Sequence, residues 1–210
     1  MHRVSSVTLL VIAKEPLPGR AKTRLTPPCS TTQAAALARA ALQDTLDVVA
    51  RTPAARRVLV FEGDGRTWRR DGFDLVSQRG EGLGERLAAA FADADPPALL
   101  DGMDTPQLTQ ELMVDAARAL EAPEVDAVLA PTLDGGYWSV GFTARTPGAF
   151  KGVTMSSHRT CREQRARLGD LGLRVHEAPL LRDVDTIEDA RAVAGIAPDT
   201  RFARTFAALR

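Results

Sequence analysis

Short apolar runs alternate with longer amphipathic segments along most of the chain. Residues 7–12 form an apolar run rich in β-branched side chains, which is typical of a buried strand. Residues 34–49 are rich in alanine and leucine and follow a cluster of hydroxyl side chains at 30–32, a combination that predicts a capped helix. The pattern therefore predicts strands and helices in alternation.

The same pattern continues to the C-terminus. Further strands are expected at 57–62, 73–78, 97–100, 125–130, 137–142 and 174–177. Further helices are expected at 83–94, at 107–120 with Thr105 as N-cap and Pro106 at the first helical position, and at 158–171, 187–194 and 202–209.

Alternating strands and helices indicate a mostly parallel sheet with helices on both faces. The predicted fold class is α/β, a Rossmann-like three-layer α/β/α sandwich, and residues 1–210 are expected to form one nucleotide-binding domain. The alternation breaks after Gly135, so a mixed sheet is expected there.

The composition of the chain disfavours several classes of function. Lys+Arg and Asp+Glu both total 27 in 210 residues, and a formal net charge of zero argues against nucleic acid as a partner. Cys29 and Cys161 lie far apart, which disfavours a zinc or redox site. No apolar run approaches the roughly 20 residues of a transmembrane segment, and a cytoplasmic protein with reduced thiols is expected.

The first strand leads into a basic loop. Two prolines and Gly19 shape this loop, and it carries four cations: Lys14, Arg20, Lys22 and Arg24. Such a loop at the end of a strand suits a phosphorylated ligand, whose charge guanidinium and backbone N–H groups can share. A solvated basic turn is the alternative. Neither the P-loop nor the Gly-x-Gly-x-x-Gly fingerprint is present here, so an ATPase or a dehydrogenase is not favoured.

Carboxylates follow three other predicted strands or loops. Asp101 and Asp104 are close enough in sequence to reach one Mg²⁺ or Mn²⁺, although they equally suit the start of the next helix. Asp134 precedes Gly135 and Gly136, a favoured hairpin turn that also leaves room for a ligand. The pair Asp183 and Asp185 suggests metal or acceptor binding, and capping of the following helix is the alternative.

Two weaker signals concern substrate contacts. Glycines spaced through 80–84 allow close passage of a base or ribose, and Arg86 suits a phosphate or a pair with Glu81 or Glu85. His158 suits an acid/base role, an acceptor contact or a plain surface position, and Trp138 is expected in the core.

Every one of these motifs comes soon after a predicted strand. In parallel sheets ligands bind beyond the carboxyl ends of the strands. We therefore expect the acidic and basic side chains to meet at one rim, with Lys22 and Asp104 on the same side of the molecule.

As a set, the motifs resemble a bacterial family of glycosyltransferase-A-type proteins provisionally labelled nucleotide-diphospho-sugar transferases. The superfamily includes the molybdenum-cofactor guanylyltransferase and the 2-phospholactate guanylyltransferase. The resemblance runs from about residue 8 to 195 and rests on Lys14…Lys22-Thr23-Arg24-Leu25, Leu83-Gly84-Glu85-Arg86, Gly102-Met103-Asp104-Thr105-Pro106, Asp134-Gly135-Gly136-Tyr137 and Asp183-Val184-Asp185-Thr186. The metal motif of such enzymes is often Asp-x-Asp, and the nearest match, Asp101-x-x-Asp104, departs from that spacing. Asp104 is the better candidate because it matches the family's Gly-x-Asp-Thr/Ser-Pro, whereas Asp101 carries little weight.

The resemblance implies a metal-dependent transferase that uses an activated nucleotide. A glycosyltransferase acting on a nucleotide-diphospho-sugar is the leading hypothesis. A guanylyltransferase-like nucleotidyltransferase acting on an NTP and a small phosphorylated acceptor is the alternative, and a non-catalytic nucleotide-binding module is the third. The resemblance does not decide whether the protein forms a homo-oligomer.

The resemblance also implies roles for individual residues. Asp104 and Asp134 are the expected catalytic residues, and Asp104 and Asp185 are the expected ligands of Mg²⁺ or Mn²⁺. The expected substrate contacts, to a nucleotide or nucleotide-sugar and a small acceptor, are Lys14, Gly19, Arg20, Lys22, Arg24, Gly82, Gly84, Arg86, Gly135 and Gly136.

Overall fold

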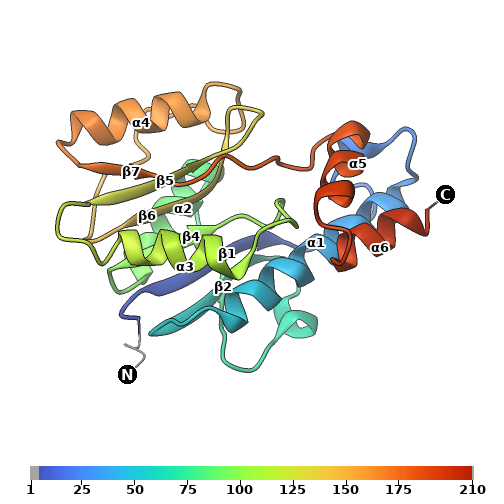
Figure 1. The fold of residues 1–210 in the computed structure, drawn as a ribbon, viewed down its shortest axis with the longest axis horizontal. Coiled ribbons are helices and arrows are strands. Elements are labelled where there is room, and N and C mark those ends of the chain that lie inside the picture. Colours follow the sequence, from blue (N-terminus) through green and yellow to red (C-terminus); the bar gives the residue numbers. More distant parts are fainter. Residues whose placement is uncertain (1–4, 210) are drawn as a thin grey trace.

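One mixed sheet of seven strands forms the centre of the molecule (Figure 1). The computed structural model describes residues 5–209. The strands lie in the order β3-β2-β1-β4-β6-β5-β7, and β6 runs antiparallel to both neighbours while the other pairs are parallel. Their bounds are β1 (Thr8–Lys14), β2 (Arg56–Glu62), β3 (Asp74–Ser77), β4 (Ala98–Asp101), β5 (Ala127–Pro131), β6 (Tyr137–Phe142) and β7 (Val175–Glu177).

Helices cover both faces of this sheet. Because successive strand residues point to opposite faces, Leu9 and Val11 of β1 pack in one core while Leu10 packs in the other. The first core includes side chains of α1 (Thr31–Arg51) and α3 (Gln110–Ala119), and the second includes those of α2 (Leu83–Asp93) and α4 (Thr160–Asp170). The predicted three-layer α/β class is confirmed, and so is the mixed strand direction after Gly135.

A third core lies beside the sheet. It joins the first half of α1 to a short 3₁₀ turn (Thr23–Leu25), α5 (Ile187–Ile196) and α6 (Arg201–Ala207). Figure 1 shows the chain leaving β7, crossing to α5 and α6, and lying beside the early loop that follows β1. Asp44 of α1 accepts hydrogen bonds from the backbone N–H groups of Arg201 (3.0 Å) and Phe202 (2.8 Å). This core therefore holds the crossing segment against the N-terminal loop.

The first residues of α1 and α3 can be compared with the N-caps that the sequence predicted. Ser30 caps α1 through a capping box with Gln33, as its position predicts. The prediction that Thr105 caps α3 is wrong, because the helix begins at Gln110 with Thr109 as its N-cap. The side chain of Gln107 explains the delay: its Nε2 donates to the Arg182 carbonyl (2.7 Å), which ties residues 105–108 to the crossing segment before the helix can start.

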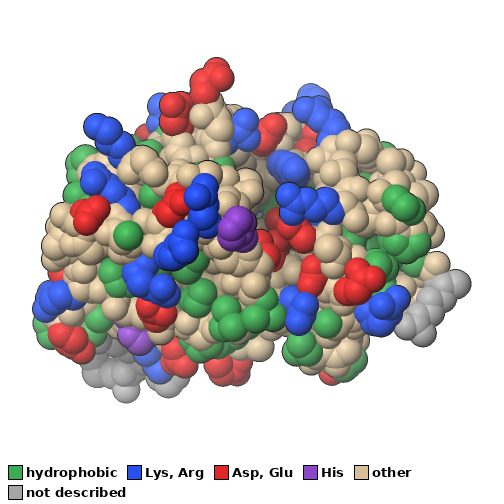
Figure 2. Space-filling view, turned by 90° about the horizontal axis from the view of Figure 1, so that it is seen from above, with side chains coloured by type: hydrophobic (Ala, Val, Ile, Leu, Met, Phe, Trp, Pro, Cys, Tyr) green, Lys and Arg blue, Asp and Glu red, His purple; other side chains and the backbone are tan. Residues whose placement is uncertain are grey.

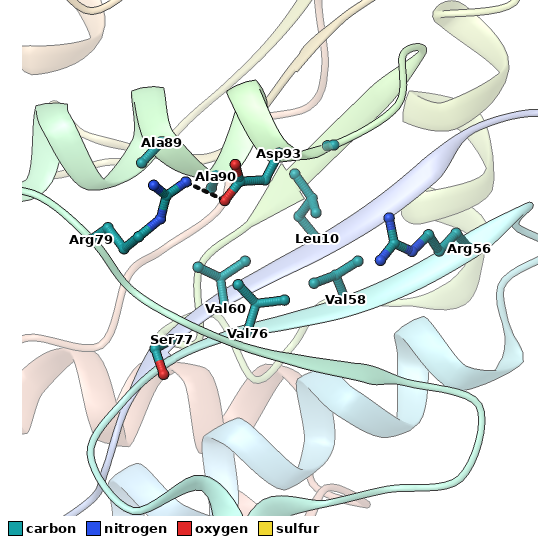
Figure 3. Close-up of a pocket in the computed structure, with 11 residues that line it drawn as sticks. Leu10, Arg56, Val58, Val60, Val76, Ser77, Arg79, Ala89, Ala90 and Asp93 are labelled. Atoms are coloured by element: carbon teal, nitrogen blue, oxygen red, sulfur yellow. Dashed lines mark hydrogen bonds and ion pairs between the residues drawn. The ribbon is translucent and has the colours of Figure 1, made fainter.

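Figure 3 shows a small cavity under α2. Its volume is about 30 Å³, and most of the lining residues are aliphatic, among them Leu10, Val58 and Val60. Arg79 and Asp93 form an ion pair of 2.5 Å beside it. Because it lies midway along the strands and is mostly aliphatic, it is a packing gap rather than a binding site. Within residues 5–209, no helix is both long enough and apolar enough to cross a bilayer.

Candidate active site

Two adjoining hollows form a cleft beyond the carboxyl ends of the parallel strands. Their volumes are about 600 and 460 Å³, and they share Lys14, Asp104, Asp134 and Asp183 in their walls. Both volumes lie within the range of small-molecule sites. Figure 2 shows acidic and basic side chains gathered around the hollow on this face. The outer hollow adds Lys22, Thr23, Arg24, Ser157, His158 and Asp185, and the inner hollow adds Glu62, Gln78, Arg86, Gly136, Tyr137 and Trp138.

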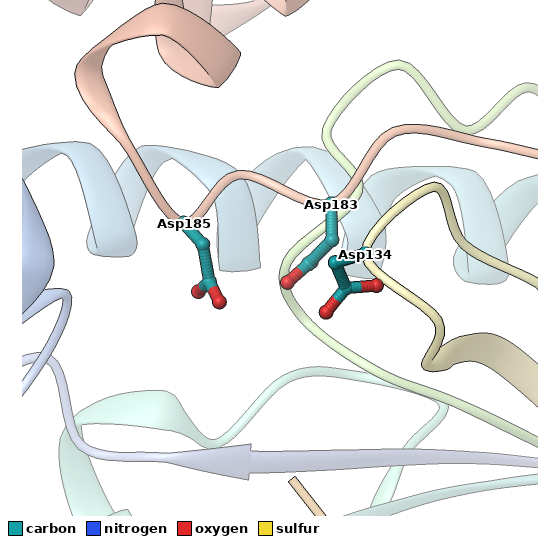
Figure 4. Close-up of side chains that lie close together, drawn as sticks. All are labelled: Asp134, Asp183 and Asp185. Carbon is teal, nitrogen blue, oxygen red and sulfur yellow. The ribbon is translucent and has the colours of Figure 1, made fainter. Parts of the chain in front are cut away.

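Three carboxylates converge in the cleft. One oxygen each from Asp134, Asp183 and Asp185 lies within 4.8 Å of the others. Figure 4 shows the three carboxylates directed into one space, with Asp183 and Asp185 on the crossing segment and Asp134 on the loop after β5. In extended backbone, residues two apart point the same way, so the spacing Asp183-x-Asp185 places both side chains on one side.

The loop after β5 fixes Asp134. Its Oδ1 accepts hydrogen bonds from Thr132 Oγ1 (2.5 Å) and from the Gly136 N–H (3.0 Å). Gly135 has φ +89°, and a Cβ there would lie 2.1 Å from the backbone oxygen of His158. Gly135 is thus required by packing against residue 158, whereas Gly136 lines the cleft.

Lys22 lies at the centre of the charged groups. Its Nζ is 2.7 Å from Asp104 Oδ1 and 3.6 Å from Asp185 Oδ1, and it also donates to the Val184 carbonyl. The predicted convergence of Lys22 and Asp104 at one rim is confirmed. Only 8% of the Lys22 side chain is exposed, so it holds the acidic groups in place rather than presenting a free cation.

Around Lys22 the electrostatics are set by the neighbouring carboxylates. Burial opposes the charged form of Lys22, but Asp104 and Asp183 outweigh that effect and raise its pKa. Burial, helped by the neighbouring carboxylates and opposed by Lys22, raises the pKa of Asp183 to about 8. Four carboxylates thus face one buried ammonium, and Asp183 retains its proton near neutral pH.

This donor set fits a divalent cation. Mg²⁺ and Mn²⁺ prefer hard oxygen ligands. A bound dication would also relieve the repulsion that keeps Asp183 protonated. The residues that would hold it are Asp134, Asp183 and Asp185, with Asp104 beside them on Lys22.

Other expected substrate contacts are divided between the cleft and its surroundings. Lys14 lines both hollows, and Arg24 lines the outer hollow with 69% of its side chain exposed, although it pairs with Asp185 (2.5 Å). Arg86 lines the inner hollow but pairs with Glu62, not with Glu81 or Glu85. The expected residues that do not line either hollow are Gly19, Arg20, Gly82, Gly84 and Gly135.

Asp101 lies apart from this site. It is fully buried at the end of β4, and neither carboxylate oxygen has a hydrogen-bond partner among residues 5–209. Burial raises its pKa to about 7, and the neighbouring Ser139 hydroxyl, which donates to the Leu100 carbonyl, only partly opposes this.

The metal ligands expected from the resemblance were Asp104 and Asp185, whereas the structure brings Asp183 together with Asp134 and Asp185. The signal was present, since Asp183-Val184-Asp185 has the Asp-x-Asp spacing that Asp101 and Asp104 lack. The prediction that Trp138 belongs to the core is confirmed, because it is 2% exposed and its Nε1 donates to the Pro179 carbonyl (2.9 Å).

The strand order and the cleft define the class of fold, that of nucleotidyltransferases and nucleotide-diphospho-sugar transferases. A similar structure is that of a Desulfovibrio desulfuricans G20 protein provisionally named a nucleotide-diphospho-sugar transferase. The two are 30% identical over 98% of this chain and 94% of that chain, with a TM-score of 0.85.

Two other similar structures are more distant in sequence and share the fold. One is Rv0371c from Mycobacterium tuberculosis H37Rv in complex with manganese, 21% identical over 91% of this chain and 98% of that chain, with a TM-score of 0.54. The other is CMP:2-keto-3-deoxy-manno-octonic acid synthetase complexed with CTP, 10% identical over 92% and 99% of the two chains, with a TM-score of 0.62.

Residues 39–157 match the family described as "Uncharacterized protein conserved in bacteria (DUF2064)", and the chain belongs to this family. No curated protein matches the sequence.

Proposed function

We propose that this protein is a divalent-metal-dependent transferase whose donor is a nucleoside-diphospho-sugar. The observation that carries the proposal is the cluster of Asp134, Asp183 and Asp185 beside the Lys22–Asp104 ion pair. Acidic side chains that can bind a cation, next to cations that can bind phosphate, are what a metal-bound diphosphate requires.

Each part of the cleft has a role in this proposal. Asp134, Asp183 and Asp185 would hold Mg²⁺ or Mn²⁺, which would supply electrostatic stabilisation to the diphosphate. Lys14 and Arg24 bind phosphate oxygens from the rim, and Lys22 keeps Asp104 and Asp185 in position. The inner hollow, with Gln78 and Arg86 in its wall, receives the base and ribose.

The reaction joins the acceptor to the sugar. An acceptor hydroxyl attacks the anomeric carbon, the bond from that carbon to the diphosphate oxygen breaks, and the oxygen keeps the electron pair. The acceptor proton passes to a base in the cleft. The manganese in the Rv0371c structure and the provisional name of the Desulfovibrio protein support the proposal.

Nucleotidyl transfer is the second candidate. The cations at the rim suit a triphosphate as well as a diphosphate, since Lys14 and Arg24 both line the outer hollow. The synthetase with bound CTP has the same fold. In this reaction the acceptor attacks the α-phosphorus and pyrophosphate leaves.

Calorimetry with Mn²⁺ and a panel of nucleoside diphosphates, nucleotide-sugars and NTPs tests the proposal. We expect at least one nucleotide to bind only with the metal, and Asp183→Asn to weaken Mn²⁺ binding at least about tenfold. Burial and the neighbouring carboxylates raise the pKa of Asp183 and so favour its neutral form, which the isosteric amide mimics, and the fold should stay intact. Asp170→Asn, exposed at the end of α4, is the matched control.

The products then separate the two candidates. Release of a nucleoside diphosphate from a nucleotide-sugar supports sugar transfer, and pyrophosphate release from an NTP supports nucleotidyl transfer. Absence of metal-dependent nucleotide binding in the unmodified protein, or unchanged Mn²⁺ affinity in Asp183→Asn, would contradict the proposal.

A further inference from the structure

We propose that residues 156–158 form the acceptor side of the cleft and that the His158 imidazole takes the proton of the acceptor hydroxyl. This inference rests on the function proposed above and assigns the base that the reaction needs. It gives this role to His158 and not to Asp134, which is one of the two residues expected from the sequence to be catalytic.

The carboxylates of the cleft are poorly suited to be the base. Asp134 already accepts two hydrogen bonds on Oδ1, and it belongs to the cluster that fits the cation. A bound dication withdraws basicity from its carboxylate ligands. Asp104 is paired with Lys22, and Glu62 is paired with Arg86.

His158 is placed where a base is required. It lines the outer hollow together with Asp134 and Asp183, and its side chain is exposed to the cleft with no hydrogen-bond partner within residues 5–209. It is also the one histidine among the described residues that line this cleft. A neutral imidazole with a free nitrogen can accept a proton.

The backbone fixes His158 relative to the acidic cluster. Residue 158 lies so close to Gly135 that a Cβ on Gly135 would meet its oxygen at 2.1 Å, and the Cys161 N–H donates to the Gly135 carbonyl (2.8 Å). Because Asp134 precedes Gly135, the imidazole and the proposed metal ligand are carried on two loops in direct contact.

Backbone strain points to the same loop. Ser156 has φ +55°, and Lys22 with φ +50° is the other non-glycine residue with positive φ among residues 5–209. Both line the outer hollow. Residues held in this region of φ cost about 1–3 kcal/mol and cluster at functional sites.

Hydrogen bonds around Thr160 maintain the strained conformation. Thr160 Oγ1 donates to the Thr154 carbonyl (2.8 Å) and accepts from the Ser157 N–H (3.0 Å). The Thr154 N–H donates to Glu163 Oε2 (2.8 Å). The loop is therefore built to hold Ser156 and His158 at the cleft, and its hydroxyls suit a hydroxylated acceptor such as a sugar or polyol.

In the proposed step, the proton leaves the acceptor as the bonds at the anomeric carbon exchange. The acceptor oxygen forms its bond to the anomeric carbon while the bond from that carbon to the diphosphate breaks, and the electron pair stays on the leaving oxygen. The acceptor hydroxyl proton passes to the free nitrogen of His158, which becomes an imidazolium and later loses the proton to water.

The test is the hydrolysis of the nucleotide-sugar that binds in the calorimetric panel. The reaction contains Mn²⁺, and water serves as the smallest acceptor. We expect His158→Gln to lower the rate of diphosphate release by about 100-fold, since general-base catalysis typically contributes about 10²–10⁴-fold. Binding of the matching nucleoside diphosphate with Mn²⁺ should stay within about twofold, because the donor contacts are elsewhere. His176→Gln, exposed on β7 and outside the cleft lining, should match the unmodified protein.

A second variant tests the loop. Ser156→Gly relieves the positive φ and removes the hydroxyl, so we expect lower turnover with unchanged or higher thermal stability. Full activity of His158→Gln would overturn the inference, as would a parallel loss of nucleotide binding. If the unmodified protein releases no diphosphate from any donor, the proposed function fails and this inference fails with it.

Discussion

The half-buried Asp183 and the fully buried Asp101 both have a raised pKa, but for different reasons. Asp183 faces a wide cleft lined by other carboxylates, and its raised pKa reflects both burial and repulsion. Asp101 faces the layer of α1 and α3, because it lies two residues beyond Leu99 on β4, and its raised pKa reflects burial alone. A bound cation would stabilise the charged form of Asp183. The charged form of Asp101 has no such partner, so its ionisation lowers the free energy of unfolding.

This difference predicts the pH dependence of Asp101→Asn. The folded protein keeps the Asp101 proton up to about pH 7, while the unfolded chain loses it near its ordinary value of 3.8. Stability therefore falls as pH rises between about 4 and 7. We expect the amide variant to lack this part of the slope and to be more stable at pH 8, by up to about 4 kcal/mol.

Urea denaturation between pH 4 and 9 measures the effect. Asp115→Asn, a change at a carboxylate with 72% of its side chain exposed, is the control and should leave the slope unchanged. The same slope in Asp101→Asn and in the unmodified protein would contradict the prediction. Asp183 contributes in the same direction up to about pH 8, so some slope remains in every case.

At the scale of structural elements, the loop between β5 and β6 links the site to the start of α4. It carries Asp134 on one side and packs Gly135 against the start of α4 on the other. Loop and helix start therefore form one unit, and their relative position decides the geometry of the cleft.

Gly135→Ala should disrupt the contact between the β5–β6 loop and the start of α4. The added methyl meets backbone at 2.1 Å and the φ of +89° disfavours any side chain, so we expect a loss of several kcal/mol in the free energy of unfolding, more than the strain cost alone of about 1–3 kcal/mol. Gly172→Ala is the matched control, since Gly172 has φ +73° but no atom lies within 4 Å of the position that its Cβ would take. Equal melting temperatures for the two variants would show that the contact with residue 158 is unimportant.

Across the whole molecule, the third core connects the sheet to the site. Phe202 is 1% exposed and stacks on Phe206, and both pack with α1 and α5. Val184, between the two aspartates, is fully buried in the same core. The position of Asp183 and Asp185 thus depends on packing more than 15 residues further along the chain.

Phe202→Ala should therefore weaken both folding and metal binding. We expect about 3–5 kcal/mol of destabilisation from the lost burial and the cavity, and a lower Mn²⁺ affinity because the segment that carries Asp185 loses its support. Ile196→Ala, a change at a side chain that is 65% exposed on α5, is the control and should cost under about 1 kcal/mol. Hydrogen exchange and Mn²⁺ calorimetry measure the two effects, and unchanged Mn²⁺ affinity in Phe202→Ala would contradict the proposed coupling.

Sequence patterns predicted most elements because local periodicity and caps are recorded in consecutive residues. Residues 137–142 form a strand as predicted, and Ser30 caps its helix. The prediction for Thr105 was wrong because the contact between Gln107 and Arg182 is invisible in the local sequence. Gly19 and Arg20 share a loop with Lys22, yet they do not line the cleft, because consecutive residues do not record which side of a loop faces a cavity.

By itself, the sequence determined the α/β class and the placement of acidic and basic motifs after strands, since the carboxyl ends of parallel strands share one edge. Tertiary structure decided that Lys22 is buried in ion pairs and that Asp183 completes the acidic cluster. It also decided that His158 reaches the cleft. These outcomes depend on burial and on distances between segments far apart in the chain, which no local pattern records.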